Sequence, residues 1–192
     1  GYNPSFHMAI DKYYGSINKL KELVDKCHQS GIAVIMDVVF NHAFSQSPLC
    51  QMYWDQANFR PSANSPYFNT VAKHPFNVGY DFNHESKFTK AYMDRVLAYL
   101  TTEFRVDGFR FDLSKGFTQT YNTDVGLWGG YDASRISLLK RMATEIKKVD
   151  PNVYLILEHF AVNSEEQQLS NEGFMLWGNG NYDYLEGAMG YT

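Results

Sequence analysis

The feature that most constrains this chain is a set of three short apolar runs, each followed by polar residues and separated from the next by a segment of helical periodicity. The runs are residues 33–40, 106–111 and 154–157, and the helical patterns cover 17–27, 86–103 and 136–146. Continuous apolar runs of this length predict strands covered on both faces, as in a parallel sheet. Their alternation with helices predicts the α/β class.

The other segments add detail to this pattern. Ser16 is placed to cap the first helix and Gly31 to end it. A shorter helix near 164–169 and a strand at 174–176 complete the alternation. Between residues 43 and 85 the periodicity disappears and four prolines occur, which predicts a loop-rich excursion, resembling a small subdomain within the larger domain.

The pattern alone does not distinguish an open, doubly wound sheet from a (β/α)8 TIM barrel. Two observations favour the barrel: polar residues follow three successive strands at their carboxyl ends, and no G-x-G-x-x-G turn follows the first strand. A full barrel needs about 250 residues. We therefore expect these 192 residues to form a partial barrel, as a fragment of a larger catalytic domain.

Bulk properties exclude some partners. A net charge of -4 and a pI near 5.8 give no electrostatic reason to expect nucleic acid. No apolar run approaches the roughly 20 residues that span a membrane. Cys27 and Cys50 are too few for a disulfide framework. The chain opens at Gly1 without an initiator methionine or signal peptide, which is typical of the inside of a longer protein and indicates no compartment.

Charged residues stand at the ends of the predicted strands. Arg110 and Asp112 should share one side of the second strand because alternate residues face the same way, and Phe109 and Phe111 should face the helices. The neighbouring guanidinium favours the ionised form of Asp112, as a nucleophile requires. Glu158 follows an apolar run that should raise its pKa, as an acid catalyst requires.

Two carboxylates of this kind on adjacent strands can cleave a glycosidic bond. Spacing alone leaves a second interpretation equally open. Arg110 and Asp112 would then form a structural ion pair, and Glu158 would merely end a strand.

Several segments, taken in order, resemble motifs of the alpha-amylase family of glycoside hydrolases (glycoside hydrolase family 13). Asp37–His42 is similar to the D-x-x-x-N-H motif at the third barrel strand, Gly108–Asp112 to the G-F-R-x-D motif at the fourth, and Glu158 to the glutamate that closes the fifth. Gly79–Asn83 is similar to a motif near the end of the excursion after the third strand, and Gly1–Pro4 to the segment after the second. The resemblance implies about strands 3 to 6 of the catalytic barrel.

The resemblance also implies roles for individual residues. Asp112 would be the nucleophile, Glu158 the general acid/base and Arg110 the residue that orients Asp112. The sequence departs from the family in one respect here. The family has a third catalytic carboxylate at the seventh strand, and nothing after Glu158 matches it.

Other positions would bind substrate or metal. The resemblance makes His42 a sugar contact at the cleavage site, Asp37 a support beneath it and Lys115 a further substrate-binding residue. Asn41 corresponds to a position that binds structural calcium in many members, although calcium needs several oxygen ligands and the sequence offers this one candidate. The chemistry itself requires no cofactor. Gly116 stands where many amylases have a histidine.

We therefore expect a retaining glycoside hydrolase that acts on α-linked glucans of the starch or glycogen type through a covalent glycosyl-enzyme. A transglycosylase or branching enzyme would use the same machinery, and a non-catalytic carbohydrate-binding relic would keep the fold without turnover. The 192 residues alone are expected to be inactive, and strand edges left uncovered by a partial barrel would favour self-association.

Overall fold

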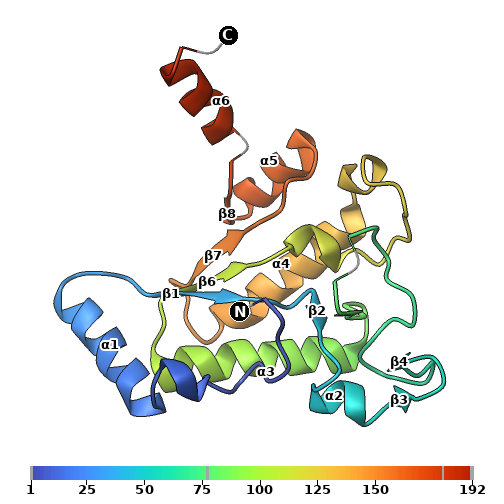
Figure 1. The fold of residues 1–192 in the computed structure, drawn as a ribbon. Coiled ribbons are helices and arrows are strands. Elements are labelled where there is room, and N and C mark those ends of the chain that lie inside the picture. Colours follow the sequence, from blue (N-terminus) through green and yellow to red (C-terminus); the bar gives the residue numbers. More distant parts are fainter. Residues whose placement is uncertain (1, 77, 179, 191–192) are drawn as a thin grey trace.

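The computed structural model describes residues 2–76, 78–178 and 180–190, with the backbone alone for 180–183. At its centre is a parallel sheet (Figure 1). Its strands lie in the order β1 (Ile35–Val38), β6 (Gly108–Phe111), β7 (Tyr154–Leu157) and β8 (Met175–Leu176). This arrangement confirms the predicted α/β class with a parallel sheet. Closure of the sheet into a barrel stays a prediction.

Helices alternate with these strands along the chain. They are α1 (Ile17–Gln29), α3 (Lys87–Phe104), α4 (Ala133–Lys147), α5 (Asn163–Asn171) and α6 (Gly180–Ala188). As predicted, the Ser16 hydroxyl caps α1 by accepting from the Lys19 N–H, and Gly31 follows its end with a left-handed φ of 71°. Across the described part of the chain, every helix is too short or too polar to cross a bilayer.

The main core lies between the sheet and helices α3 and α4. Phe109 and Phe111 are fully buried, as the alternation along β6 predicts. They belong to the same cluster as Leu97 of α3 and Leu139 of α4. On the opposite side of β6, a Cβ on Gly108 would lie 2.5 Å from the Tyr154 carbonyl oxygen, so only glycine lets β6 and β7 approach this closely.

Strand β1 differs from its prediction. The apolar run 33–40 predicts a long strand buried on both faces, but β1 has four residues, and Ile35 and the side chain of Asp37 are 36% and 45% exposed. The reason is its place in the sheet. β1 is an edge strand among the described residues, so β6 covers one of its sides.

The excursion between β1 and α3 contains short elements that the sequence did not predict. They are β2 (His42–Ala43), α2 (Pro48–Gln51), β3 (Trp54–Asp55), β4 (Arg60–Pro61) and β5 (Tyr80–Asp81). β2 pairs with β5 and β3 with β4, both antiparallel. Because β2 follows β1 directly, its pairing with β5 brings the end of the excursion back beside the sheet.

Candidate active site

The carboxyl ends of β1, β6 and β7 bring four predicted site residues together. Arg110 lies opposite Asp37 in the parallel register, and its Nη1 is 2.9 Å from Asp37 Oδ1 and 2.8 Å from Asp112 Oδ1. Its Nη2 is 2.9 Å from Glu158 Oε2. The strand register explains why these groups are close. Phe111 pairs with Leu157, so Asp112 and Glu158, the next residue on each strand, lie side by side. The Arg110 guanidinium therefore forms ion pairs with three carboxylates.

Aromatic rings enclose the guanidinium. Arg110 is only 6% exposed. Its Cζ lies 4.0 Å from the centre of the Trp177 ring and 5.9 Å from that of Tyr2, in cation–π geometry. The Tyr2 hydroxyl also donates to Asp37 Oδ2 at 3.0 Å. Trp177 was not predicted as a site residue, although its place directly after β8 is the same strand-end position that marked the others.

The protonation of Asp112 differs from its prediction. Burial, followed by the hydrogen bond with Glu158, raises the pKa of Asp112 to about 6 even though Arg110 acts to lower it. This direction is opposite to the one predicted from Arg110 alone. The sequence could not place Glu158 beside Asp112, where its acidic group disfavours the ionisation of Asp112.

Backbone and side-chain donors fix the position of Glu158. The Leu113 N–H donates to Glu158 Oε2 at 3.0 Å. The N–H and the hydroxyl of Ser114 both donate to the Glu158 carbonyl oxygen, at 3.0 and 2.9 Å. Leu113 adopts a left-handed φ of 48°, which is unusual for a residue other than glycine. The turn after β6 is thus shaped to hold the acid that ends β7.

A buried ionic network lies behind this turn. Arg135 donates through Nε and Nη2 to the two carboxylate oxygens of Glu165, both at 2.7 Å. His159 lies 2.7 Å from Glu165 through Nε2 and 3.0 Å from the Ser114 hydroxyl through Nδ1. Burial lowers the pKa of His159, although Glu165 acts to raise it. This network was not predicted from the sequence, and it links α4 and α5 to Ser114, whose hydroxyl donates to the Glu158 carbonyl oxygen.

Lys115 lies beside the carboxylate pair at the edge of a cavity. Its Nζ donates to the Phe160 carbonyl oxygen at 3.0 Å and lies 4.3 Å from the centre of the Trp128 ring. The cavity measures about 270 Å³, and Phe76 and Glu158 also line it. A molecule that contacts Glu158 within this cavity would therefore also lie close to Lys115.

His42 and Asn41 lie deeper. The His42 ring is buried, with Nε2 3.0 Å from the Tyr2 carbonyl oxygen and Nδ1 3.2 Å from Asn41 Nδ2. Burial lowers the pKa of His42. Both ring nitrogens are therefore engaged within the protein. Asn41 is fully buried, and its Oδ1 has no hydrogen-bond partner among the described residues.

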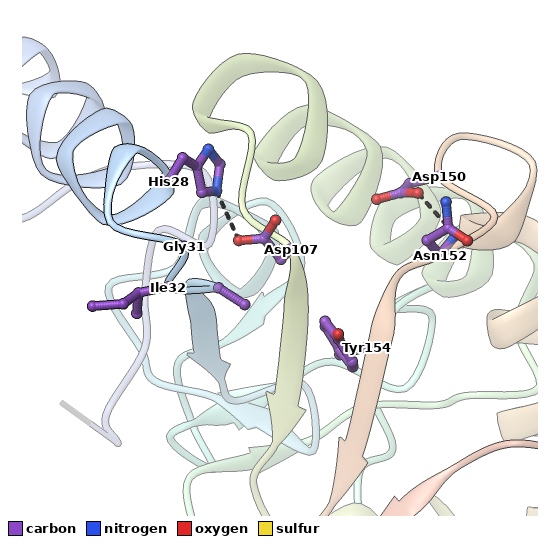
Figure 2. Close-up of a pocket in the computed structure, with 8 residues that line it drawn as sticks. His28, Gly31, Ile32, Asp107, Asp150, Asn152 and Tyr154 are labelled. Atoms are coloured by element: carbon purple, nitrogen blue, oxygen red, sulfur yellow. Dashed lines mark hydrogen bonds and ion pairs between the residues drawn. The ribbon is translucent and has the colours of Figure 1, made fainter.

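A second hollow lies at the opposite edge of the sheet (Figure 2). It measures about 420 Å³ and is lined by His28, Asp107 and Tyr154, at the amino-terminal ends of β6 and β7. His28 Nε2 is 2.8 Å from Asp107 Oδ2, which also accepts from the Val34 N–H at 2.6 Å. These groups tie the end of α1 to the sheet. Parallel sheets bind their ligands at the carboxyl ends of the strands, which favours the Arg110 site.

The chain is similar to known proteins. The family model for the alpha amylase catalytic domain matches residues 1–79. Chloroplastic isoamylase SU1 of Zea mays is 36% identical over 113 residues, covering 57% of this chain and 14% of that protein. The 1,4-alpha-glucan-branching enzyme of Candida glabrata is 33% identical over 116 residues, covering 58% and 16%. The structure of Eubacterium rectale Amy13B shares the fold, with a TM-score of 0.72 at 20% identity over 93% of this chain and 37% of that one.

A parallel sheet that ends in a guanidinium and adjacent carboxylates defines an α/β protein of the class that contains the paired-carboxylate glycosidases. Together with the matches, these features make the chain similar to part of the catalytic domain of the alpha-amylase family. The chain spans 14% and 16% of the two relatives named above.

Proposed function

We propose that this chain carries the nucleophile and the general acid/base of a retaining enzyme that acts on α-linked glucans, with Asp112 and Glu158 in these two roles. The observation that carries the proposal is that one guanidinium contacts both carboxyl groups, with Arg110 Nη1 2.8 Å from Asp112 Oδ1 and Nη2 2.9 Å from Glu158 Oε2. Retaining glycosidases hold their carboxyl groups about 5–5.5 Å apart, whereas inverting enzymes separate them by about 6.5–9.5 Å to admit a water molecule. Two carboxyl groups that contact the two terminal nitrogens of one guanidinium lie close together, which favours the retaining arrangement.

In the first step, an Asp112 carboxylate oxygen attacks the anomeric carbon while the glycosidic bond breaks. Glu158 transfers its proton to the departing oxygen, so the leaving sugar is released as an alcohol. In the second step, Glu158 takes a proton from water as the water oxygen attacks the anomeric carbon and frees the Asp112 carboxylate. Arg110 orients Asp112 by donating to its Oδ1 at 2.8 Å.

The remaining predicted residues complete the proposal. Lys115 would contact the sugar on the leaving-group side, because it borders the cavity next to Glu158. Asp37 would support the site from below by holding the guanidinium that it shares with Asp112 and Glu158. His42 would contact the substrate only after giving up its bond to the Tyr2 carbonyl oxygen. The names of the isoamylase and branching-enzyme relatives support starch-type α-glucans as the substrate.

The same covalent intermediate allows a second outcome. If another sugar rather than water attacks it, the enzyme transfers or branches glucan chains, as the name of the Candida glabrata relative indicates for that protein. A chain that binds glucan without turnover is the third alternative. Products distinguish the first two, because hydrolysis creates new reducing ends and transfer does not.

The test compares two variants in the protein that carries this chain. Maltooligosaccharides are the substrate, and both reducing ends and product lengths are followed. Asp112→Asn should abolish conversion, because it removes the nucleophile with little change in volume. Glu158→Gln should also abolish it but should still form a glycosyl-enzyme with α-maltosyl fluoride, whose leaving group needs no proton.

Asp94→Asn is the matched control. Asp94 is paired with Arg141 at 2.6 Å on α3, away from the site, and this variant should stay active. Near wild-type activity of Asp112→Asn would show that Asp112 is only an ion-pair partner of Arg110. Glucan binding without conversion by the unmutated protein would favour the binding relic.

A further inference from the structure

Three buried polar side chains meet between the excursion and the sheet. Asn41, His74 and Asp81 are 0%, 3% and 3% exposed. Asn41 Oδ1, both ring nitrogens of His74 and Asp81 Oδ1 have no hydrogen-bond partner among the described residues. His74 Nε2 lies 3.6 Å from Asp81 Oδ1. Buried polar atoms are nearly always paired, so this cluster must have a function that the contacts already described do not explain.

Gly116 shows how closely these atoms converge. A Cβ at this residue would lie 2.0 Å from Asn41 Oδ1 and 2.9 Å from His74 Nε2. Both atoms therefore border the same small space beside the backbone of the turn after β6. A side chain at position 116 would displace the Asn41 amide, so glycine is required here by close packing.

The resemblance to alpha-amylases assigns structural calcium to this place, through Asn41. Calcium takes six to eight oxygen ligands at about 2.3–2.6 Å. The cluster offers two free side-chain oxygens, Asn41 Oδ1 and Asp81 Oδ1. Asp81 Oδ2 already accepts from Asn69 Nδ2 at 2.8 Å and from the Lys73 N–H at 3.1 Å. The third member is an imidazole, which suits softer metals, so this donor set does not fit calcium.

We propose that His74 takes the place of the metal ion and that Asn41, His74 and Asp81 form a calcium-independent brace. His74 Nε2 lies 3.6 Å from Asp81 Oδ1, within ion-pair distance, and borders the same space as Asn41 Oδ1. The ring is held in place because it stacks on Trp128, with centroids 5.1 Å apart and planes at 17°. An imidazole fixed by stacking can organise two acceptors much as a bound cation would, without a metal to lose.

The brace joins parts of the chain that are distant in sequence. Asn41 lies between β1 and β2, His74 and Asp81 belong to the excursion, and Gly116 lies in the turn that follows Asp112. Its second link is Asn69, which binds Asp81 and also donates to Gln119 Oε1 at 3.0 Å. The brace therefore holds the excursion against the loop that positions Leu113 and Ser114. The structural part of this proposal does not depend on the proposed function.

The first test measures metal dependence of the purified chain. Elemental analysis after exchange into metal-free buffer should find far less than one calcium per chain. The midpoint of thermal unfolding should be the same in millimolar calcium and in EGTA. Calcium bound at one equivalent, or a midpoint that rises with calcium and saturates, would overturn the proposal.

The second test removes the donor. His74→Leu replaces the polar ring beside the two buried oxygens with an apolar side chain and should lower the midpoint by roughly 4–10 °C in either buffer. His74→Gln, which keeps an N–H group, should recover part of the loss. Equal midpoints for wild type and His74→Leu would refute the brace. If His74→Leu does not fold, the calcium response of the wild type and the His74→Gln variant still decide the question. Glucan conversion in EGTA tests the proposed function separately.

Discussion

Replacing Asp112 with asparagine should stabilise the folded chain at neutral pH. Burial and the bond to Glu158 raise the pKa of Asp112 from its ordinary value of 3.8 to about 6. A carboxyl group with a raised pKa in the folded state binds its proton more tightly there than in the unfolded chain. The folding penalty therefore grows as the pH rises from 3.8 to 6, is complete above 6 and is absent below 3.8. At about 1.4 kcal/mol for each pKa unit, the full penalty is about 3 kcal/mol.

Asparagine should remove this penalty while keeping the local bonds. Its amide oxygen can still accept from Arg110, and its amide N–H can donate to Glu158. We expect the free energy of unfolding of Asp112→Asn to exceed that of the wild type by up to about 3 kcal/mol at pH 7 and to match it near pH 4. Urea unfolding followed by circular dichroism at both pH values measures this difference.

The control is Asp94→Asn, which breaks a surface ion pair with Arg141 and should bring no gain at pH 7. Asp112→Asn would refute the electrostatic reasoning if it were no more stable than the wild type at pH 7, or if its gain were equal at both pH values. A gain at pH 7 with loss of turnover would mean that the site retains an unfavourable charge for the sake of its chemistry.

The other predictions concern pH and the network behind the turn. Nucleophilic attack needs the ionised form of Asp112, and with the pKa of Asp112 raised to about 6 the rate should fall about tenfold per pH unit below that value; a flat rate from pH 4 to 7 would contradict this. Glu165→Gln should destabilise the chain by about 3–5 kcal/mol in urea unfolding, because it leaves the Arg135 charge buried without a counter-ion. Glu172→Gln, which breaks an exposed pair with Lys140, should cost under about 1 kcal/mol, and equal losses would show that burial is not the cause.

The sequence predicted the parallel strands and the meeting of charges because both follow from short-range periodicity. The alternation of Phe109, Arg110, Phe111 and Asp112 sends the apolar residues to the core and the charged ones to the site. The predicted strand 154–157 coincides with β7, where the apolar run has clear ends. By contrast, the two-residue strands of the excursion were not predicted, since a period of two cannot be recognised in two residues.

The network around Glu165 was missed for a different reason. Glu165 lies in the first turn of α5, where an acidic residue is usually explained by solvent exposure and the helix dipole. Its partner Arg135 is thirty positions earlier in the chain, on α4. No local pattern connects the two, and their burial depends on how α4 and α5 pack behind the turn. The groups proposed to react are therefore easier to predict from sequence than the groups that hold them in place.

The two charged clusters of this molecule are built on opposite principles, which supports the assignment of their roles. Arg135 is balanced by one carboxylate, which receives two of its hydrogen bonds, and Arg135 and Glu165 are almost fully buried. Arg110 faces three carboxylates that remain partly exposed, so negative charge is in excess. A balanced, dry pair gives rigidity. A cluster with excess negative charge lowers the stability of the resting protein. It can, however, stabilise the positively charged, oxocarbenium-like transition state of glycoside cleavage. The balanced cluster fixes the turn that positions Glu158, and the unbalanced cluster is where the chemistry should occur.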